Sequence, residues 1–394
     1  MARGFDAGTM FCVKSELNSD GQMEFSIQRN CFLQVASSDD TEDVLRENKW
    51  SYAKSGDSFY ILGEDAIKLK NLLTMGDDSI IVTRVGELRR PMKDGLLNIG
   101  EETLSAAMIQ EIIKNLVGSP STTNEHLCFC VPGDPVDRNM SVLMHQKMLT
   151  SYLQKLGYTV EFIPEALAIV FAESPTAESP DGEYTYSGIG ISCGAGMMNI
   201  CLAWKKIPLI SFSIARSGDW IDEQVALQLK TSRASVTKFK ETKLDLNNIN
   251  YGDMRQAALA IYYRSAIEHA IKNFSEKFNK INNQDATDSS FEIVVAGGTA
   301  MVPGFLDVFK EILSTMELPF KVKNVRLADE PLYTVAAGCL VKALSSEKKA
   351  EKANTAAAEG EAAEVLEELE KQVPTVKQEL QPPLGKIRVP KRGS

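Results

Sequence analysis

The sequence predicts an α/β protein made of two similar sheet-and-helix halves around a cleft, followed by a disordered tail. Three observations predict this class. Strand-like and helix-like segments alternate along residues 1–344, which indicates sheets covered by helices. Each half opens with a strand, a glycine-containing turn and a second strand, at residues 4–17 and again at residues 186–204. Near Ser345 the composition changes to Ala, Glu, Lys and Pro with almost no aromatic residues, which favours disorder.

The first half is expected over residues 1–160, with a small upper subdomain at about residues 30–80. Its helices show apolar residues at a spacing near 3.6, and its buried strands are short apolar runs that end in turn residues. The expected elements are strands at 4–17 and 23–35, a strand, turn and helix at 58–73, a helix at 99–117, a strand at 126–134, a helix at 139–157 and a strand at 158–164.

The second half is expected over residues 161–344, with a helical upper subdomain at about residues 217–288. Ser217 or Asp219 can cap the helix that begins this subdomain. The expected elements are a helix at 165–174, strands with tight turns at 186–215, helices over 217–283, a strand, glycine turn and helix at 291–313, and a last helix at 331–344.

Composition limits the classes of function. The chain has 394 residues, 44% of them hydrophobic, and a net charge of −10, which argues against direct nucleic-acid binding. Its seven cysteines form no CxxC pair and lie mostly in apolar runs, so we expect buried thiols in a reducing compartment. No apolar run reaches the roughly 20 residues of a membrane span, and the N-terminus enters a strand within a few residues. We therefore expect a cytoplasmic protein with no signal peptide, membrane anchor or transmembrane segment.

The tail at residues 345–394 is expected to be mostly disordered, with a short helix around residues 362–371. Its end, KIRVPKRGS, is basic after an acidic stretch. Two interpretations stay open for it: a solvated tail, or a peptide that docks on a partner protein or an anionic surface.

Four stretches point to a single phosphate pocket. DAGT at residues 6–9 offers a carboxylate at Asp6 for Mg²⁺ and a glycine turn that lets the backbone approach a phosphate. SCGAG at residues 192–196 is a second turn of the same kind. AGGTAM at residues 296–301 lies at a helix start, where free amides favour anions. PEALA places Glu165 at another helix start, where it can position or deprotonate a water.

Each of these motifs alone has an ordinary structural explanation, because glycine turns and carboxylates at helix N-termini are common. Their order and spacing resemble the actin-like ATPase family, which includes actin, Hsp70-type chaperones and sugar kinases. Within it the chain is most similar to filament formers of the MreB, MamK and ParM kind. The segments that carry the resemblance are FDAGT, ILGEDAIKL, RRPMKDGLL, FCVPGD, PEALAIVFA, GISCGAGMMNICL, SGDWIDEQVA, AGGTAMVPGF and PLYTVAAGCL. It covers residues 1–344.

The resemblance implies ATP and Mg²⁺ as cofactors and gives roles to individual residues. Asp6 would be the carboxylate that holds Mg²⁺ through water, and Glu165 would orient the attacking water. Ala336, Ala337 and Gly338 match the helix at which the halves pivot. The residues implied to surround the nucleotide are Gly8, Thr9, Ser192, Gly194, Ala195, Gly196, Gly218, Asp219, Lys240, Glu241, Gly297, Gly298, Thr299 and Met301.

The sequence departs from the family in the second loop. Ser192 stands where the family has Asp, Met197 replaces a hydroxyl residue, and Asn199 stands where actin has His and MreB has Glu. Loss of one carboxylate is expected to weaken the hold on Mg²⁺ and to raise the hydrolysis barrier by roughly 2–4 kcal/mol.

The resemblance implies a bacterial cytoskeletal protein that binds ATP, self-associates head to tail into filaments and hydrolyses ATP slowly. An adaptor or scaffold of the FtsA or PilM type, with little or no ATPase activity, is the alternative that Ser192 and the long tail favour. A small-molecule kinase lacks a candidate substrate base. His126, His145 and His269 have no metal-site spacing.

Overall fold

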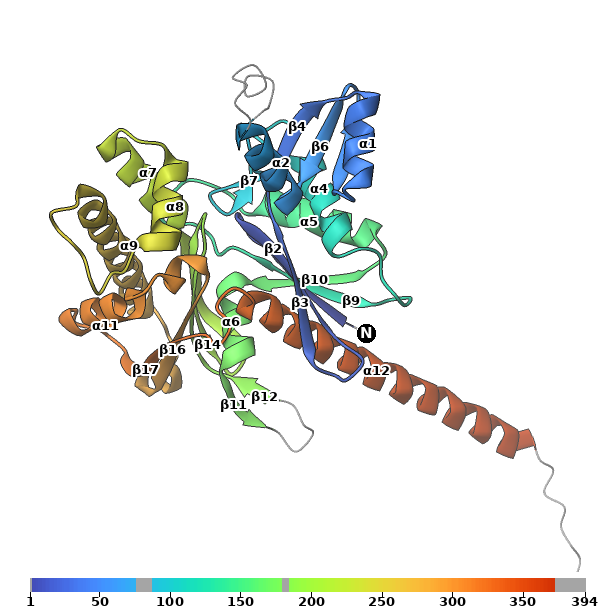
Figure 1. The fold of residues 1–394 in the computed structure, drawn as a ribbon. Helices are drawn as coiled ribbons and strands as arrows, with labels where there is room; N and C mark the ends of the chain where they lie inside the picture. Colours follow the sequence, from blue (N-terminus) through green and yellow to red (C-terminus); the bar gives the residue numbers. More distant parts are fainter. Residues whose placement is uncertain (1, 76–86, 179–183, 373–394) are drawn as a thin grey trace, which may run out of the picture. The chain divides into compact units, whose positions relative to one another are not determined.

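Two five-stranded sheets with the same strand arrangement form the framework of the molecule (Figure 1). The structure is a computed structural model that describes residues 2–75, 87–178 and 184–372. In both sheets three antiparallel strands from the start of a half are followed by two parallel strands that the chain adds later. The internal repeat expected from the two glycine turns is therefore present in the topology.

The first sheet has the order β10-β9-β1-β2-β3. β10 continues to Pro164, so this sheet extends beyond residue 160. Helices α4 and α5 contribute, with this sheet, to one hydrophobic core. The bounds are β1 Ala2–Ala7, β2 Phe11–Leu17, β3 Met23–Arg29, β9 His126–Val131, β10 Thr159–Pro164, α4 Ser105–Leu116 and α5 Leu143–Lys155.

A small three-stranded sheet with its own helices follows β3. This sheet has the order β4-β6-β5 and shares a core of Leu33, Leu45, Phe59 and Ile61 with its helices. A two-stranded hairpin of β7 and β8 then leads back toward the first sheet. The bounds are β4 Phe32–Ala36, α1 Asp39–Glu47, β5 Tyr52–Ser55, β6 Ser58–Leu62, α2 Gly63–Met75, β7 Met92–Lys93 and β8 Leu96–Leu97.

The second sheet has the order β15-β14-β13-β16-β17 and packs against α7, α9 and α11 in the largest core. Four helices, α7 to α10, follow one another between β15 and β16 along the chain. The bounds are β11 Pro175–Glu178, β12 Tyr184–Tyr186, β13 Gly188–Cys193, β14 Met198–Trp204, β15 Ile207–Ile214, α7 Gly218–Leu229, α8 Arg233–Lys243, α9 Met254–Phe278, α10 Gln284–Asp288, β16 Ser290–Ala296, the 3₁₀ turn η1 Gly298–Met301, α11 Phe305–Thr315 and β17 Lys321–Leu327.

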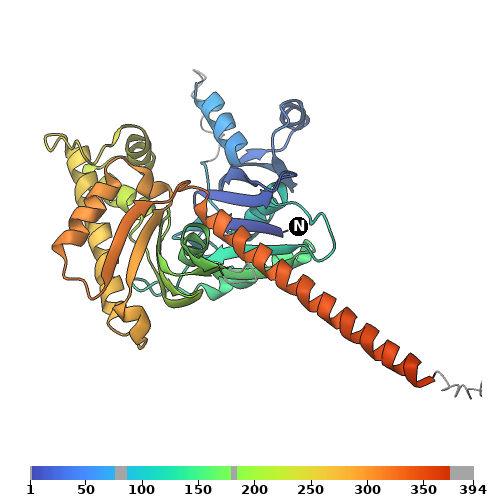
Figure 2. The ribbon, with the colours of Figure 1, turned by 90° about the horizontal axis from the view of Figure 1, so that it is seen from below.

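Two helices fill the space between the sheets: α6, Glu165–Glu173, and the start of α12, Thr334–Gln372 (Figure 2). Backbone contact there is close. A Cβ at Gly338 would lie 1.8 Å from the carbonyl oxygen of Ala168, and a Cβ at Gly4 would lie 2.3 Å from that of Ala336. Ser15 Oγ also donates to the carbonyl of Ala336 at 2.7 Å. The small residues expected at a pivot helix are thus needed for close packing.

The chain divides into two units, residues 1–347 and 348–394. In the second unit the backbone of α12 is helical to Gln372, within the stretch where the composition predicts a mostly disordered tail with a short helix around residues 362–371. Ala, Glu and Lys dominate this stretch and have high intrinsic helix propensity, which accounts for the helical backbone. The basic end KIRVPKRGS, for which docking on a partner is one of the two interpretations, lies outside the described residues.

The described helices include none that is long and apolar enough to span a membrane. In the same ranges, all seven cysteines are buried free thiols, as expected from their apolar surroundings.

Candidate nucleotide site

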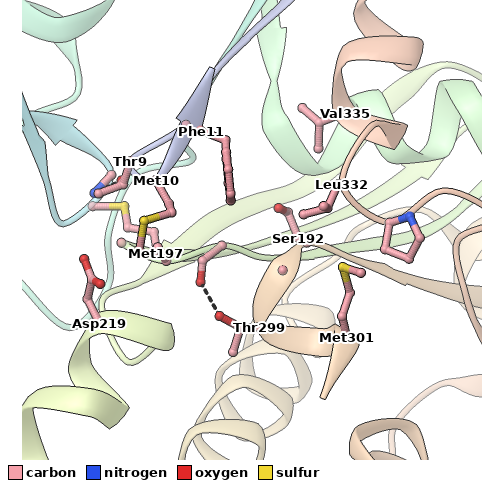
Figure 3. A pocket seen from close by; sticks show the side chains of 18 of the residues that line it. Thr9, Met10, Phe11, Ser192, Met197, Asp219, Thr299, Met301, Leu332 and Val335 are labelled. Carbon is pink, nitrogen blue, oxygen red and sulfur yellow. Dashed lines mark hydrogen bonds between the residues drawn. The ribbon is translucent and has the colours of Figure 1, made fainter. Parts of the chain in front are cut away.

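A cavity of about 370 Å³ opens where the glycine turns of the two sheets face each other. Figure 3 shows Thr9, Ser192, Met197, Asp219, Thr299 and Met301 around it. Of the sixteen candidate residues from the sequence, fifteen line this cavity; Gly218 lies just behind the second loop. The structure therefore brings together residues that are up to 295 positions apart, from Asp6 to Met301.

The first loop follows β1 and presents Asp6, Gly8 and Thr9. A Cβ at Gly8 would lie 2.5 Å from the carbonyl oxygen of Phe11, so only glycine allows this tight return into β2. Thr9 Oγ1 accepts a hydrogen bond of 3.1 Å from the backbone N–H of Gly95. The Thr9 hydroxyl is thus already bonded to the hairpin of β7 and β8.

The second loop is fixed by its own carbonyl groups. Gly194 O accepts from Ser217 Oγ at 2.6 Å and from Thr299 Oγ1 at 2.8 Å, a bond marked in Figure 3. The N–H of Asp219 donates to Ala195 O at 2.7 Å. The sequence suggests Ser217 as a possible cap of α7, but the Ser217 side chain makes no capping hydrogen bond. Its hydroxyl instead joins the helix start to the loop.

Ser192 and Asn199 both hold Glu165. They are cross-strand partners on β13 and β14, so their side chains share one face of the sheet. Ser192 Oγ donates to Glu165 Oε1 at 2.6 Å, and Asn199 Nδ2 donates to Oε2 at 2.9 Å. Asn199 Oδ1 accepts from the N–H of Gly133 at 2.9 Å, which fixes its amide orientation. Asn199 was not among the candidates; its place opposite Ser192 in the hairpin was the available signal.

Two carboxylates face the cavity without a basic partner in the described part of the chain. Burial, with a further contribution from repulsion by Asp6, raises the pKa of Glu165 to about 8. The hydrogen bonds from Ser192 and Asn199 act in the opposite direction and lower this pKa. Burial also raises the pKa of Asp6 to about 6, against a hydrogen bond of 3.2 Å from Cys130 Sγ. A buried carboxylate that lacks a cation is suited to a divalent metal ion.

Asp219 and Lys240 are engaged in ion pairs that the sequence did not predict. The two oxygens of Asp219 meet Arg90 Nη1 and Nη2 at 3.3 and 2.8 Å, and both side chains are at least 85% buried. Lys240 Nζ lies 2.8 Å from each oxygen of Asp222, which is also buried. The Arg90 pair joins the first half to α7. Glu241, next to Lys240, is exposed at the cavity edge.

The third glycine stretch, residues 296–301, lies against the end of β13. Gly297 has a φ of +94°, and a Cβ there would lie 2.4 Å from the carbonyl oxygen of Cys193. Gly298 and Thr299 begin η1, a 3₁₀ turn rather than the expected α-helix start. Met301 is 48% exposed and lines the cavity with apolar residues such as Leu332.

The hairpin of β7 and β8 is part of the site as well. A Cβ at Gly196 would lie 2.2 Å from the backbone nitrogen of Gly95 and 2.4 Å from Thr9 Oγ1, so three segments meet at one point. Gly95 has a φ of +75° and contacts the Met197 side chain. The segment RRPMKDGLL, which contains Gly95, carries part of the family resemblance, but the sequence alone indicates no role for it in the site.

Solved structures share this fold. The MamK double helical filament matches with a TM-score of 0.61 at 16% identity, covering 86% of this chain and 97% of that chain. MreB 5 of Spiroplasma citri bound to AMPPNP matches with a TM-score of 0.60 at 14% identity, covering 89% and 98%. A MamK filament determined by cryo-electron microscopy matches with a TM-score of 0.59 at 16% identity, covering 86% and 96%. The expected actin-like fold is confirmed.

No curated protein sequence matches this chain. The volactin family matches it over residues 1–343, which is nearly the whole first unit. The protein therefore belongs to the volactin family.

Proposed function

We propose that this protein binds ATP with Mg²⁺ in the cavity, assembles into filaments in the cytoplasm and hydrolyses the nucleotide slowly. The observation that carries the proposal is the pair of buried carboxylates, Asp6 and Glu165, between two glycine loops. Two structures of similar fold are described as filaments, and another is described as bound to AMPPNP.

Asp6 would hold Mg²⁺ through its water shell, and the ion would offset the charge of the phosphates. Asp6 is suited to this because burial disfavours its ionised form until a cation arrives. The loop residues Gly8 and Gly194 place backbone close to the cavity, where amide groups can meet phosphate oxygens.

Glu165 would orient and deprotonate the attacking water. Ser192 and Asn199 hold both of its oxygens, so the carboxylate has a fixed direction. A pKa of about 8 makes it a matched proton acceptor near neutral pH, but it is mainly protonated when the site is empty. Ser192 supplies no charge, and its hydroxyl is used by Glu165, so slow hydrolysis is the expected result.

The hydrogen bond from Ser192 to Glu165 also supports a second candidate function, a nucleotide-binding scaffold with little or no hydrolysis. In that case the Ser192–Glu165 bond of 2.6 Å would persist with nucleotide bound and weaken the carboxylate as a proton acceptor for a water. ATP would then act only as a structural ligand.

One sample separates these functions. Purified full-length protein is incubated with ATP and Mg²⁺, then examined by pelleting, negative-stain microscopy and phosphate release. Filaments with slow release support the proposal, and filaments without release favour the scaffold. Protein that binds no ATP and stays monomeric at high concentration would refute both.

A further inference from the structure

The charges around the cavity leave one cation without a buried partner. The lining contains five acidic residues, Asp6, Glu165, Asp219, Asp222 and Glu241, and two basic ones, Arg29 and Lys240. Lys240 is neutralised by Asp222 and Asp219 by Arg90, as described above. Among the described residues that line the cavity, Arg29 is therefore the basic side chain that remains available to an anionic ligand.

The contacts of Arg29 within the chain are weak. Its Nε lies 3.3 Å from Glu64 Oε1, and the Glu64 side chain is 55% exposed. In the described ranges the Arg29 guanidinium makes no hydrogen bond, and its Nε is buried without a hydrogen-bond partner. An ion pair with an exposed carboxylate contributes little, so it does not compete strongly with a phosphate.

Aromatic packing nevertheless holds Arg29 at the cavity. Arg29 ends β3 directly opposite Phe11, the first residue of β2. Its guanidinium carbon lies 4.3 Å from the centre of the Phe11 ring. Figure 3 shows this ring pointing into the cavity between Met10 and Leu332. A guanidinium placed over a ring loses less freedom when it binds a ligand than a free one would.

We propose that Arg29 binds the phosphate chain of the nucleotide and so sets the preference for di- and triphosphates over the nucleoside. Phe11 follows the first glycine loop by two residues, which places Arg29 beside the loop expected to meet phosphates. The planar fork of arginine recognises phosphate oxygens in pairs. This inference rests on the proposed nucleotide binding.

The test is a calorimetric titration of the full-length protein with adenosine, AMP, ADP and ATP in the presence of Mg²⁺. In the wild type the affinity should rise with the number of phosphates. In Arg29→Met the Kd for ADP and ATP should increase about 10- to 100-fold, the loss expected for charge-assisted hydrogen bonds, while the Kd for adenosine stays unchanged. Arg29→Lys should restore part of the affinity.

Two further variants provide controls. Arg46→Met removes the same charge from an exposed pair with Glu42 and should leave every Kd unchanged. Glu64→Gln frees Arg29 and should not weaken ATP binding. An equal loss for adenosine and ATP in Arg29→Met, or no loss at all, would overturn the inference while the proposed function stands. A wild type that binds none of the four ligands would overturn both.

Discussion

Replacing Glu165 with Gln should change how the stability of the empty protein depends on pH. The pKa of Glu165 is about 8 in the folded protein, against about 4.5 for an unperturbed glutamate. Between these values the folded state holds a proton that the unfolded state has lost, so stability falls as pH rises. For a single site with these constants, the loss between pH 6.5 and pH 8.5 is about 2 kcal/mol.

The assay is urea unfolding without nucleotide at several pH values in this range. The range avoids His145, whose pKa burial lowers to about 4 and whose effect on stability has the opposite sign at lower pH. Glu165→Gln should remove most of the decrease in the free energy of unfolding between pH 6.5 and pH 8.5. This holds even if the substitution changes the stability at every pH by a constant amount. Glu241→Gln, an exposed acidic residue of the same cavity, is the matched control and should keep the wild-type slope. A Glu165→Gln variant with the wild-type slope would refute the reasoning.

Three other tests, which use four substitutions, examine the packing and the polar contacts of the site. Gly338→Ala should destabilise the protein by about 3 kcal/mol in urea, because its new methyl group overlaps a backbone carbonyl. Arg90→Met and Asp219→Asn, alone and together, should give a coupling of about 1–3 kcal/mol in unfolding experiments. Ser192→Ala removes a bond that lowers the pKa of Glu165, so the pH-dependent loss of stability should move to higher pH.

Each of these has an outcome that contradicts it. Gly100→Ala meets nothing within 4 Å and is the control for Gly338→Ala; equal effects would remove the packing argument. Strictly additive effects at Arg90 and Asp219 would mean that the two side chains do not interact. An unchanged pH profile in Ser192→Ala would mean that its hydroxyl does not hold Glu165.

The fold and the cavity lining were accessible from the sequence because their signals are local. A strand, a glycine turn and a second strand are contiguous, and so are the turns at Gly8 and Gly194. Once both hairpins are recognised, the family order places the remaining loops around one pocket. The end of α12 could not be placed from the sequence, because the Ala- and Glu-rich stretch has high helix propensity while its low hydrophobicity favours disorder.

The partners of the charged residues could not be predicted in the same way. Arg90 and Asp219 are 129 positions apart, and nothing in either segment identifies the other. Ser192 looked like a lost carboxylate, whereas the structure shows it donating to Glu165 across 27 positions. Such pairings depend on how separate elements meet, which only the tertiary structure determines.

The balance of charge links the cation and the nucleotide. After the pairs of Asp219 with Arg90 and Lys240 with Asp222 are set aside, the cavity retains Asp6, Glu165 and Glu241 against Arg29 alone. A polyphosphate without a metal ion would add negative charge next to these carboxylates and would favour their protonated forms. A divalent cation reverses that effect. Nucleotide affinity in this site should therefore depend on Mg²⁺ far more steeply above pH 6 than below it, where Asp6 holds its own proton.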